Sequence, residues 1–143
     1  MTQTMTLALT TPAGPVAAGE AAAIQSRIEA TAAAMQAGDL DTVLSGYVPG
    51  GLVEFAPGAE ARGTAALAAG YAEFLAMQPR ITFDCHKVLV AGDLALHLGA
   101  WTVEGTAPDG TAIRDGGFSV VVLRRDPDGA WRIVIDVPQA TAG

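Results

Sequence analysis

The sequence contains few charged residues, few basic residues and a single cysteine. Cys85 has no partner within the 143 residues, so the chain forms no internal disulfide and has no CxxC-type metal site. Eight Lys and Arg residues are outnumbered by fifteen Asp and Glu residues, which gives a formal net charge of −7. Such a chain offers no basic stripe that could neutralise phosphate groups. We therefore expect neither nucleic acid nor a membrane surface as a partner.

No apolar run is long enough to span a bilayer, and residues 1–9 lack the basic region of a signal peptide. A cytoplasmic location is the resulting expectation. Half of the residues are hydrophobic, which allows 143 residues to bury the core of one domain. Residues 1–19 carry no charge and are expected to form a flexible leader. Residues 20–143 are expected to form the single domain.

Residues 81–137 predict four β-strands joined by tight turns. The strands cover residues 81–91, 94–107, 111–125 and 130–137, which are rich in Val, Leu, Ile, Phe and Trp. Asp, Gly and Pro in the three gaps are typical of hairpin turns. Turns this short require antiparallel neighbours, because a parallel pair needs a crossover of about a dozen residues.

The loop lengths predict which side chains share a face. We expect two-residue loops at residues 92–93 and 109–110 and a four-residue loop at residues 126–129. One face then carries Asp84, His86, Val88, His97, Gly99, Trp101, Phe118, Val120, Val122, Ile133 and Ile135. The opposite face carries Phe83, Cys85, Leu89, Leu96, Leu98, Ala100, Val121, Leu123, Val134 and Asp136. A slip of one residue in a hairpin would exchange the faces of everything beyond it.

Both predicted faces are largely apolar, whereas an antiparallel sheet with one face in water alternates apolar and polar residues. Each face must therefore be covered. Upstream helices can cover one face, and a second copy of the chain can cover the other through a two-fold contact. We predict a homodimer formed through the sheet.

Three helices are expected before this sheet. Apolar residues at helical spacing predict helices over residues 20–37 and 65–77, and Asp39 is suited to cap a short helix over residues 40–47. A short edge strand over residues 52–55 and a loop over residues 57–63 lie between them. This order predicts an α+β domain with its helices on one side of a curved, mainly antiparallel sheet.

Several short motifs occur in a characteristic order. They are Ala-Gly-Asp-Leu-Asp at residues 37–41, Tyr47, Arg-Gly-Thr-Ala-Ala-Leu at residues 62–67, Gly-Ala-Trp-Arg-Ile at residues 129–133, and Asp136. In these motifs the chain resembles the nuclear transport factor 2-like superfamily, which includes SnoaL-like cyclases and ketosteroid isomerases, over residues 21–137. The resemblance implies a cone-shaped barrel-like fold with a deep apolar pocket between the helices and the sheet. It also implies dimerisation through the sheet.

The resemblance does not extend to the chemistry of ketosteroid isomerases. Their aspartate base lies in Val-Glu-Asp-Pro, whereas residues 53–57 read Val-Glu-Phe-Ala-Pro, and Phe55 accepts no proton. Their oxyanion-binding tyrosine falls on Thr31. Their second oxyanion-binding acid falls near Gly116, one residue from Asp115. Steroid isomerisation is therefore not expected.

Asp84, His86 and His97 are the candidate catalytic residues, because they are the polar residues of the predicted pocket face. One hypothesis is that His97 or His86 acts as a base whose tautomer Asp84 fixes. A second is that two histidines and a carboxylate bind a metal ion. The third is that all three are hydrogen-bonded or solvated residues at the sheet margin. We assign no metal and expect no organic cofactor.

A flat apolar ligand would need an apolar and aromatic lining. The candidate lining residues are Phe55, Tyr71, Phe74, Gly99, Trp101, Phe118, Val120 and Ile135. The same residues could instead form plain core. Asp115 and Asp136 could together activate a water, but the predicted register places both on the outer face, as surface or interface charges.

Two functions are compatible with these features. The first is a SnoaL-like small-molecule pocket enzyme, an isomerase, cyclase or hydratase that acts on an apolar metabolite by acid–base chemistry. The second is a non-catalytic dimeric module that binds a small apolar ligand or serves in assembly. Convergence of Asp84, His86 and His97 inside an enclosed cavity would favour the enzyme.

Overall fold

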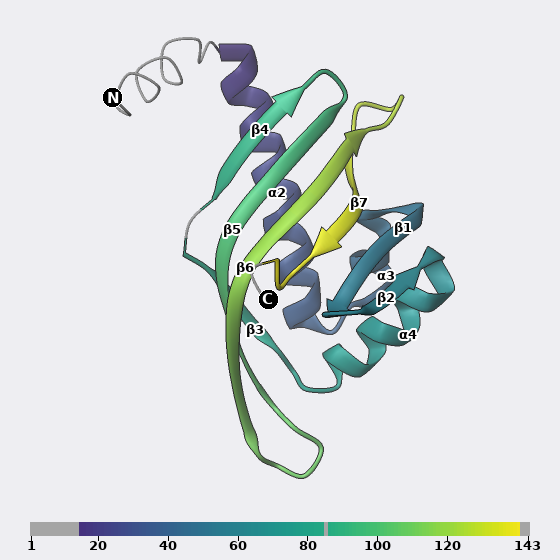
Figure 1. Ribbon diagram of the computed structural model, residues 1–143, viewed down its shortest axis with the longest axis vertical. Helices are drawn as coiled ribbons and strands as arrows, with labels where there is room; N and C mark the ends of the chain where they lie inside the picture. Colours follow the sequence, from purple (N-terminus) through teal and green to yellow (C-terminus); the bar gives the residue numbers. More distant parts are fainter. Residues whose placement is uncertain (1–14, 85, 141–143) are drawn as a thin grey trace.

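The computed structural model describes residues 15–84 and 86–140 (Figure 1). The elements are α2 (Pro15–Ala37), α3 (Leu40–Ser45), β1 (Tyr47–Ala56), β2 (Ala59–Arg62), α4 (Gly63–Leu75), β3 (Arg80–Phe83), β4 (Lys87–Ala91), β5 (Leu94–Thr106), β6 (Ala112–Arg125) and β7 (Trp131–Val137). Helix α2 begins five residues before the expected helix. The rest of the expected leader and Cys85, which was expected on the outer face of the sheet, lie outside the described residues.

The described strands form one sheet in the order β2-β1-β7-β6-β5-β3, with β4 also paired to β5. Every pair is antiparallel except β1 with β7. Helix α2 packs across β3, β4, β5 and β7, while α4 packs on β1 and β2 (Figure 1). The predicted α+β architecture, with three helices on a curved and mainly antiparallel sheet, is confirmed.

Local sequence explains where the first two helices meet. Gly38 follows α2 with a φ of 72°, a left-handed conformation that glycine adopts at low cost. Asp39 then caps α3, because its carboxylate accepts hydrogen bonds from the Thr42 amide at 3.2 Å and the Thr42 hydroxyl at 2.6 Å. The predicted role of Asp39 is confirmed.

The β4–β5 hairpin has the predicted two-residue loop, which pairs Ala91 with Leu94 and Val88 with His97. The β5–β6 hairpin differs. Its loop has three residues, Pro108 to Gly110, and the amide of Ala107 donates to the Thr111 carbonyl at 2.8 Å. Trp101 therefore pairs with Gly117 and not with Phe118.

This one-residue shift makes the predicted faces of β6 wrong, and a register shift within β7, between Ile133 and Ile135, makes those of the rest of β7 wrong. Val121 lies opposite His97 and Asp136 lies opposite Val121, so both face the helices. Phe118, Val120 and Ile135 pair with residues of the outer face instead, as does Val122. Three of the expected pocket residues are therefore on the side of the sheet away from the helices.

A second correction concerns β3. Phe83, and not Asp84, lies opposite Trp101, so Phe83 faces the helices and Asp84 is exposed. The predicted continuous strand over residues 81–91 is divided into β3 and β4. Because of this interruption, Val88 still shares the helix-facing side with His97.

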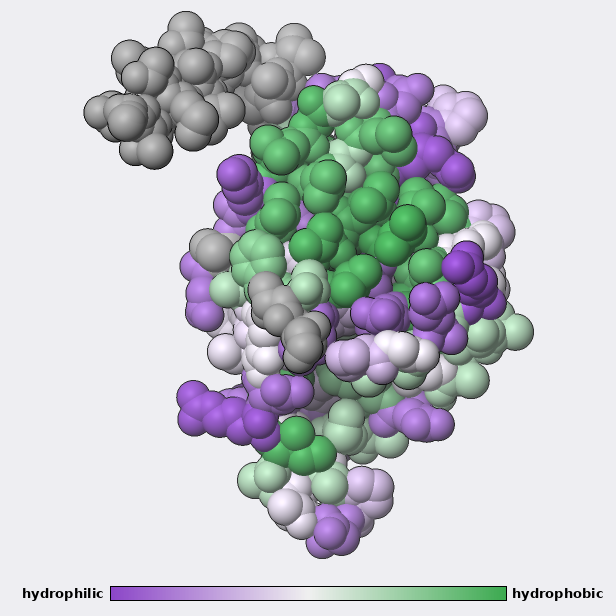
Figure 2. All heavy atoms as spheres, viewed as in Figure 1, coloured by the Kyte–Doolittle hydropathy of each residue, from purple (hydrophilic) through white to green (hydrophobic). Residues whose placement is uncertain are grey.

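The outer face is apolar along much of its length. Figure 2 shows a contiguous hydrophobic area over β4, β5 and β6. Leu89 and Leu94 are 48% and 54% exposed there. The neighbouring residues of the outer face are half-buried: Leu96, Leu98, Phe118, Val120, Val122 and Ile135. We call these eight residues the outer apolar patch.

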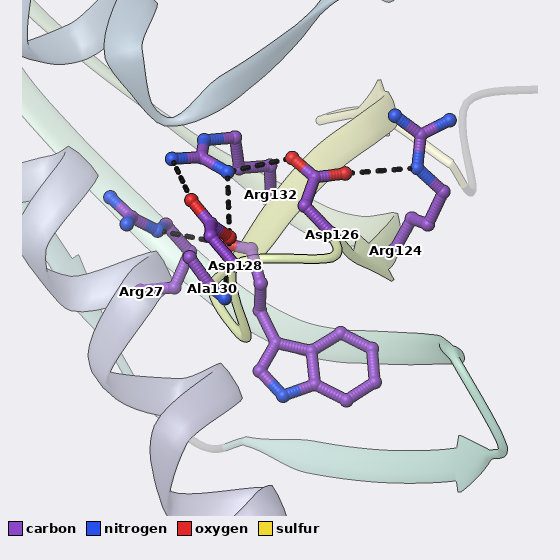
Figure 3. Close-up of polar contacts among 7 residues, drawn as sticks. Arg27, Arg124, Asp126, Asp128, Ala130 and Arg132 are labelled. Carbon is purple, nitrogen blue, oxygen red and sulfur yellow. Dashed lines mark hydrogen bonds and ion pairs between the residues drawn. The ribbon is translucent and has the colours of Figure 1, made fainter.

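A network of ion pairs lies at one end of this patch, around the β6–β7 turn (Figure 3). The Arg132 guanidinium contacts Asp126 at 2.6 Å and Asp128 at 3.2 Å, and Arg124 contacts Asp126 at 3.2 Å. Two arginines and two aspartates balance each other's charge. The turn, Pro127 to Gly129, is again a three-residue loop, because the Asp126 amide donates to the Ala130 carbonyl at 2.9 Å.

The register can be tested with two leucines on neighbouring strands. Leu123 is fully buried on the helix-facing side, whereas Leu94 is more than half exposed. Leu123→Ala should lower the free energy of unfolding by about 2–5 kcal/mol, because it leaves a cavity in the core. Leu94→Ala should lower it by clearly less than Leu123→Ala does, because it shortens an exposed side chain and leaves no cavity in the core. Urea denaturation measures both, and equal effects would contradict the register.

Candidate functional site

A cavity of about 290 Å³ lies between the helices and the helix-facing side of the sheet. Most of its wall is apolar, from Ile28 and Met35 on α2 to Trp101 and Val121 on the sheet. Six polar residues interrupt this wall: Thr31, Tyr71, Asp115, Ser119, Asp136 and Gln139. A space of this size and lining suits a small apolar molecule that is held in orientation by a few polar contacts.

Half of the predicted lining residues are found in the cavity wall. Phe55, Tyr71, Phe74 and Trp101 line it. Gly99 is buried on the helix-facing side, where its carbonyl accepts a hydrogen bond from Ser119 at 3.3 Å, but it is not part of the wall. Phe118, Val120 and Ile135 are on the outer face, for the register reason given above.

The segment after β7 closes the cavity on one side. The indole Nε1 of Trp101 donates to the Pro138 carbonyl at 2.8 Å, and the side-chain Nε2 of Gln139 donates to the Gly116 carbonyl at 3.3 Å. Both Pro138 and Gln139 line the cavity. These two bonds hold the chain across the sheet, so the wall here is built by the backbone after the last strand.

Asp136 places a carboxylate in this apolar wall. The hydroxyl of Tyr47 donates to Asp136 Oδ2 at 2.7 Å, and the same hydroxyl is hydrogen-bonded to that of Tyr71. Tyr47 has one hydroxyl proton, so while Tyr47 donates to Asp136 its oxygen accepts the proton of Tyr71. Tyr71, Tyr47 and Asp136 thus form a chain that ends at a carboxylate in the cavity.

Burial controls the acidity of this chain. It raises the pKa of Asp136 to about 6, and the hydrogen bond from Tyr47 opposes that rise. Burial, together with the charge of Asp136, raises the pKa of both tyrosines well above the usual value. Asp136 therefore exchanges a proton near neutral pH while the tyrosines stay protonated, which is the behaviour of a general acid or base.

The two predicted histidines also come together, but without Asp84. His86 Nδ1 lies 2.6 Å from His97 Nε2, and His86 Nε2 lies 3.4 Å from the Glu29 carboxylate of α2. Glu29, and not Asp84, is the acidic partner of the pair. His97 is completely buried, and burial lowers its pKa to about 4, with a further contribution from His86.

Neither histidine is part of the cavity wall. Phe83 separates the pair from the cavity, because it lines the cavity and its ring lies 5.1 Å from that of His86 and 5.9 Å from that of His97. Within residues 15–84 and 86–140, no three His, Cys, Asp or Glu residues are arranged to hold a metal. None of the helices in this part of the chain could cross a membrane.

Sequence reasoning missed Asp136, Tyr47 and Glu29 as site residues. Asp115 and Asp136 were both assigned to the outer face, and both line the cavity. The length of the β5–β6 loop explains the error for Asp115, and the register shift within β7 explains it for Asp136. Asp115 is exposed, and its carboxylate accepts a hydrogen bond from the Gly116 amide at 2.8 Å. The Pro-Asp-Gly motif of residues 108–110 was the signal that could have corrected the assignment of Asp115. The register shift that turns Asp136 toward the cavity lies within β7, outside both Pro-Asp-Gly loops.

The burial of Asp136 should appear as a pH-dependent stability. The folded pKa of about 6 exceeds the unfolded value of 3.8, so the folded state holds the proton longer and loses stability as pH rises from 4 to 6. Asp136→Asn has no carboxyl group at this position and should not lose stability in this way. The unfolding free energy of the variant minus that of the wild type should therefore increase by about 3 kcal/mol between pH 4 and pH 7.

Urea denaturation at several pH values measures this difference. Asp115→Asn is the matched control, because it makes the same change on an exposed side chain of the same cavity. An identical pH profile for the two variants would show that Asp136 is not held protonated by burial.

Comparison with known proteins gives a family match and several fold matches. The family model of the SnoaL-like domain matches residues 28–134. A nuclear transport factor 2-like superfamily protein from Salmonella enterica has 19% identity and a TM-score of 0.74, over 84% of this chain and 91% of that one. No curated protein matches the sequence.

Two further solved structures share the fold. A ketosteroid isomerase-like protein from Erwinia carotovora has 21% identity and a TM-score of 0.72, over 82% of this chain and 93% of that one. A nuclear transport factor 2-like protein with a cystatin-like fold from Novosphingobium aromaticivorans has 24% identity and a TM-score of 0.71, over 90% and 87%. At these identities the solved structures show a common fold.

Proposed function

The chain belongs to the SnoaL-like domain family, and from this premise we propose that it is an enzyme that acts on a small apolar molecule by acid–base chemistry. The observation that carries the proposal is the position of Asp136. Its carboxylate lies in an apolar cavity of about 290 Å³, is hydrogen-bonded to Tyr47, and has a pKa of about 6. A carboxyl group with such a pKa can both remove and return a proton near neutral pH.

The cavity suggests the kind of reaction. Asp136 as a carboxylate would take a proton from a carbon next to a carbonyl group, and as the acid it would return the proton at another atom. Isomerisation, cyclisation and hydration of apolar carbonyl compounds all use such transfers. Tyr71 and Tyr47 would support the ionised form of Asp136, because the hydroxyl chain donates toward it.

In this proposal Asp84 has no role, because it is exposed. The alternative, a non-catalytic module that binds an apolar ligand, would use the same cavity without proton transfer. Asp136 distinguishes the two, because ligand binding by the apolar walls does not require its ionisation.

Proton transfer can be tested before the natural substrate is known. 2-Tetralone is a small apolar ketone whose α-protons exchange with deuterium, and proton NMR follows the exchange. The protein should accelerate this exchange, with a rate that rises through about pH 6 as Asp136 ionises. Asp136→Asn should reduce the protein-dependent rate by at least about 100-fold, the usual scale of a lost general base.

Asp115→Asn is again the control and should keep most of the rate. Exchange no faster than in buffer would contradict catalysis and favour the ligand-binding module. An unchanged rate in Asp136→Asn would contradict the role of Asp136.

We also propose that the outer apolar patch is covered by a second copy of the chain. The patch is continuous and includes two leucines that are about half exposed, which is unusual for the surface of a monomer (Figure 2). Ion pairs lie at both ends of the same face. Arg124, Arg132, Asp126 and Asp128 lie at one end, and Glu104 contacts Arg80 and Arg114 at the other.

These borders favour a copy of the same chain as the partner. The protein carries a net charge of −7, so two copies repel each other in general. The patch itself avoids an excess of acidic groups, because two arginines and two aspartates lie at one end and two arginines and one glutamate at the other. A two-fold contact would therefore bury the leucines of both copies without bringing two acidic ends together.

Sedimentation equilibrium tests the dimer. The wild type should have about twice the 14.5 kDa mass of one chain. Leu94→Asp should shift the mass toward one chain while circular dichroism stays unchanged, because Leu94 is already 54% exposed. Ala112→Asp, an exposed position at the far end of β6, is the control and should remain a dimer. A wild-type mass of one chain would refute the proposal.

A further inference from the structure

A second polar chain runs beside the cavity, from α2 to the interior of the sheet. Its three members are Glu29, His86 and His97, joined at 3.4 Å and 2.6 Å. Their exposure falls along the chain, from 55% for the Glu29 side chain through 14% for that of His86 to 0% for His97. Gln25, one turn earlier on α2, donates to the Glu29 carboxylate at 3.3 Å and helps to hold it in place.

The contacts indicate which histidine nitrogens carry protons. The Glu29 carboxylate only accepts hydrogen bonds, so its 3.4 Å contact favours a proton on His86 Nε2. A neutral His86 then has a bare Nδ1, which accepts the proton of His97 Nε2. A neutral His97 therefore keeps a lone pair on Nδ1. Glu29 therefore sets the donor and acceptor roles of both histidines.

His97 Nδ1 is a hydrogen-bond acceptor with nothing to accept from. It is buried and has no hydrogen-bond partner among the described residues. A buried polar atom without a partner costs roughly 1–3 kcal/mol, so such an atom calls for an explanation. A ligand that donates a hydrogen bond would remove this cost.

The sheet places His97 next to the cavity and level with Asp136. His97 pairs with Val121 on β6, and Val121 pairs with Asp136 on β7, so the three lie in one row across the helix-facing side. Two strand spacings separate the backbones of His97 and Asp136 by roughly 10 Å. Val121 and Phe83, which lie next to His97, both line the cavity.

We propose that Glu29 and His86 hold His97 Nδ1 as the acceptor for a hydroxyl group on the ligand of the cavity. This inference rests on the proposed function and specifies its substrate class: an apolar ring compound with a hydroxyl group at the end remote from Asp136. The Phe83 side chain lies between the cavity and the imidazole, and its rotation about the Cα–Cβ bond gives the hydroxyl access. His97 would contact the ligand, and Glu29 and His86 are positioning residues.

The direction of the chain can be measured by nitrogen-15 NMR of the imidazole rings. In the wild type at pH 7, both histidines should be protonated on Nε2 and bare on Nδ1. Glu29→Gln should mix the tautomers, because its amide can donate as well as accept. Glu20→Gln is the control, since Glu20 is on the same helix but pairs with Arg125. A proton on His97 Nδ1 in the wild type, or identical spectra for Glu29→Gln and the wild type, would refute the proposal that Glu29 sets the protonation of the two histidines.

The acceptor role can be measured with two probes of nearly equal size, 2-naphthol and 2-fluoronaphthalene. Only 2-naphthol donates a hydrogen bond. The wild type should bind it about fivefold to tenfold more tightly, the usual value of one net hydrogen bond. His97→Phe, which keeps the ring but not the nitrogen, should bind both probes equally. Isothermal titration measures the dissociation constants.

Asp136→Asn separates this proposal from the proposed function. If His97 is the acceptor, the preference for 2-naphthol should survive in Asp136→Asn even when that variant has lost proton exchange. A preference that survives in His97→Phe but not in Asp136→Asn would show that Asp136 holds the hydroxyl group, and would refute the role of His97. Equal binding of both probes to the wild type, or binding of neither, would also refute it.

Discussion

The lengths of two hairpin loops, together with one register shift within β7, decide which groups reach the cavity. Each loop is a Pro-Asp-Gly tripeptide whose glycine has a φ of 88°. In each, the aspartate carboxylate accepts the amide hydrogen bond two residues later, at 2.9 Å for both Asp109 and Asp128. Three-residue loops of this kind set the strand pairing where β6 and β7 begin, and a register shift between Ile133 and Ile135 moves the pairing of the rest of β7 by one residue. Asp136 is in the cavity because of this shift, since it pairs with Val121 only beyond it.

The same constraint explains how much the sequence could predict. The order of elements and the helix-side location of the cavity follow from apolar periodicity and from turn residues, which are local signals. The β4–β5 hairpin was also predictable, since a Gly-Asp pair between two apolar runs leaves room for a two-residue loop only. Asp-Gly at residues 109–110 gives the same local signal, yet the preceding proline is part of the loop. One residue of difference reversed the faces of Phe118 and Val120, and a register shift within β7 reversed that of Asp136.

Contacts between distant segments were beyond any local signal. Glu29 precedes His86 by more than fifty residues, and only the crossing of α2 over β4 brings them together. Tyr47 and Asp136 are likewise joined across the β1–β7 pair, which is the parallel pair of the sheet. A sequence shows which residues could form such contacts. Which of them meet depends on how the elements cross, and here the acidic residue beside His86 is Glu29 and not Asp84.

Burial shifts the pKa values of Asp136 and His97 in opposite directions, yet both shifts favour the uncharged form of the side chain. Loss of water raises the pKa of Asp136 to about 6 and lowers that of His97 to about 4, so each is pushed toward its uncharged form. Near pH 6 the buried part of the cavity wall therefore holds at most a partial negative charge, on Asp136, while the second carboxylate of the wall, that of Asp115, is exposed. In this buried part a charged ligand would lose its hydration without finding a full opposite charge, whereas an uncharged apolar ligand loses little. This favours a neutral molecule as the ligand of the proposed enzyme, with Asp136 as the buried group that becomes charged when a proton is moved.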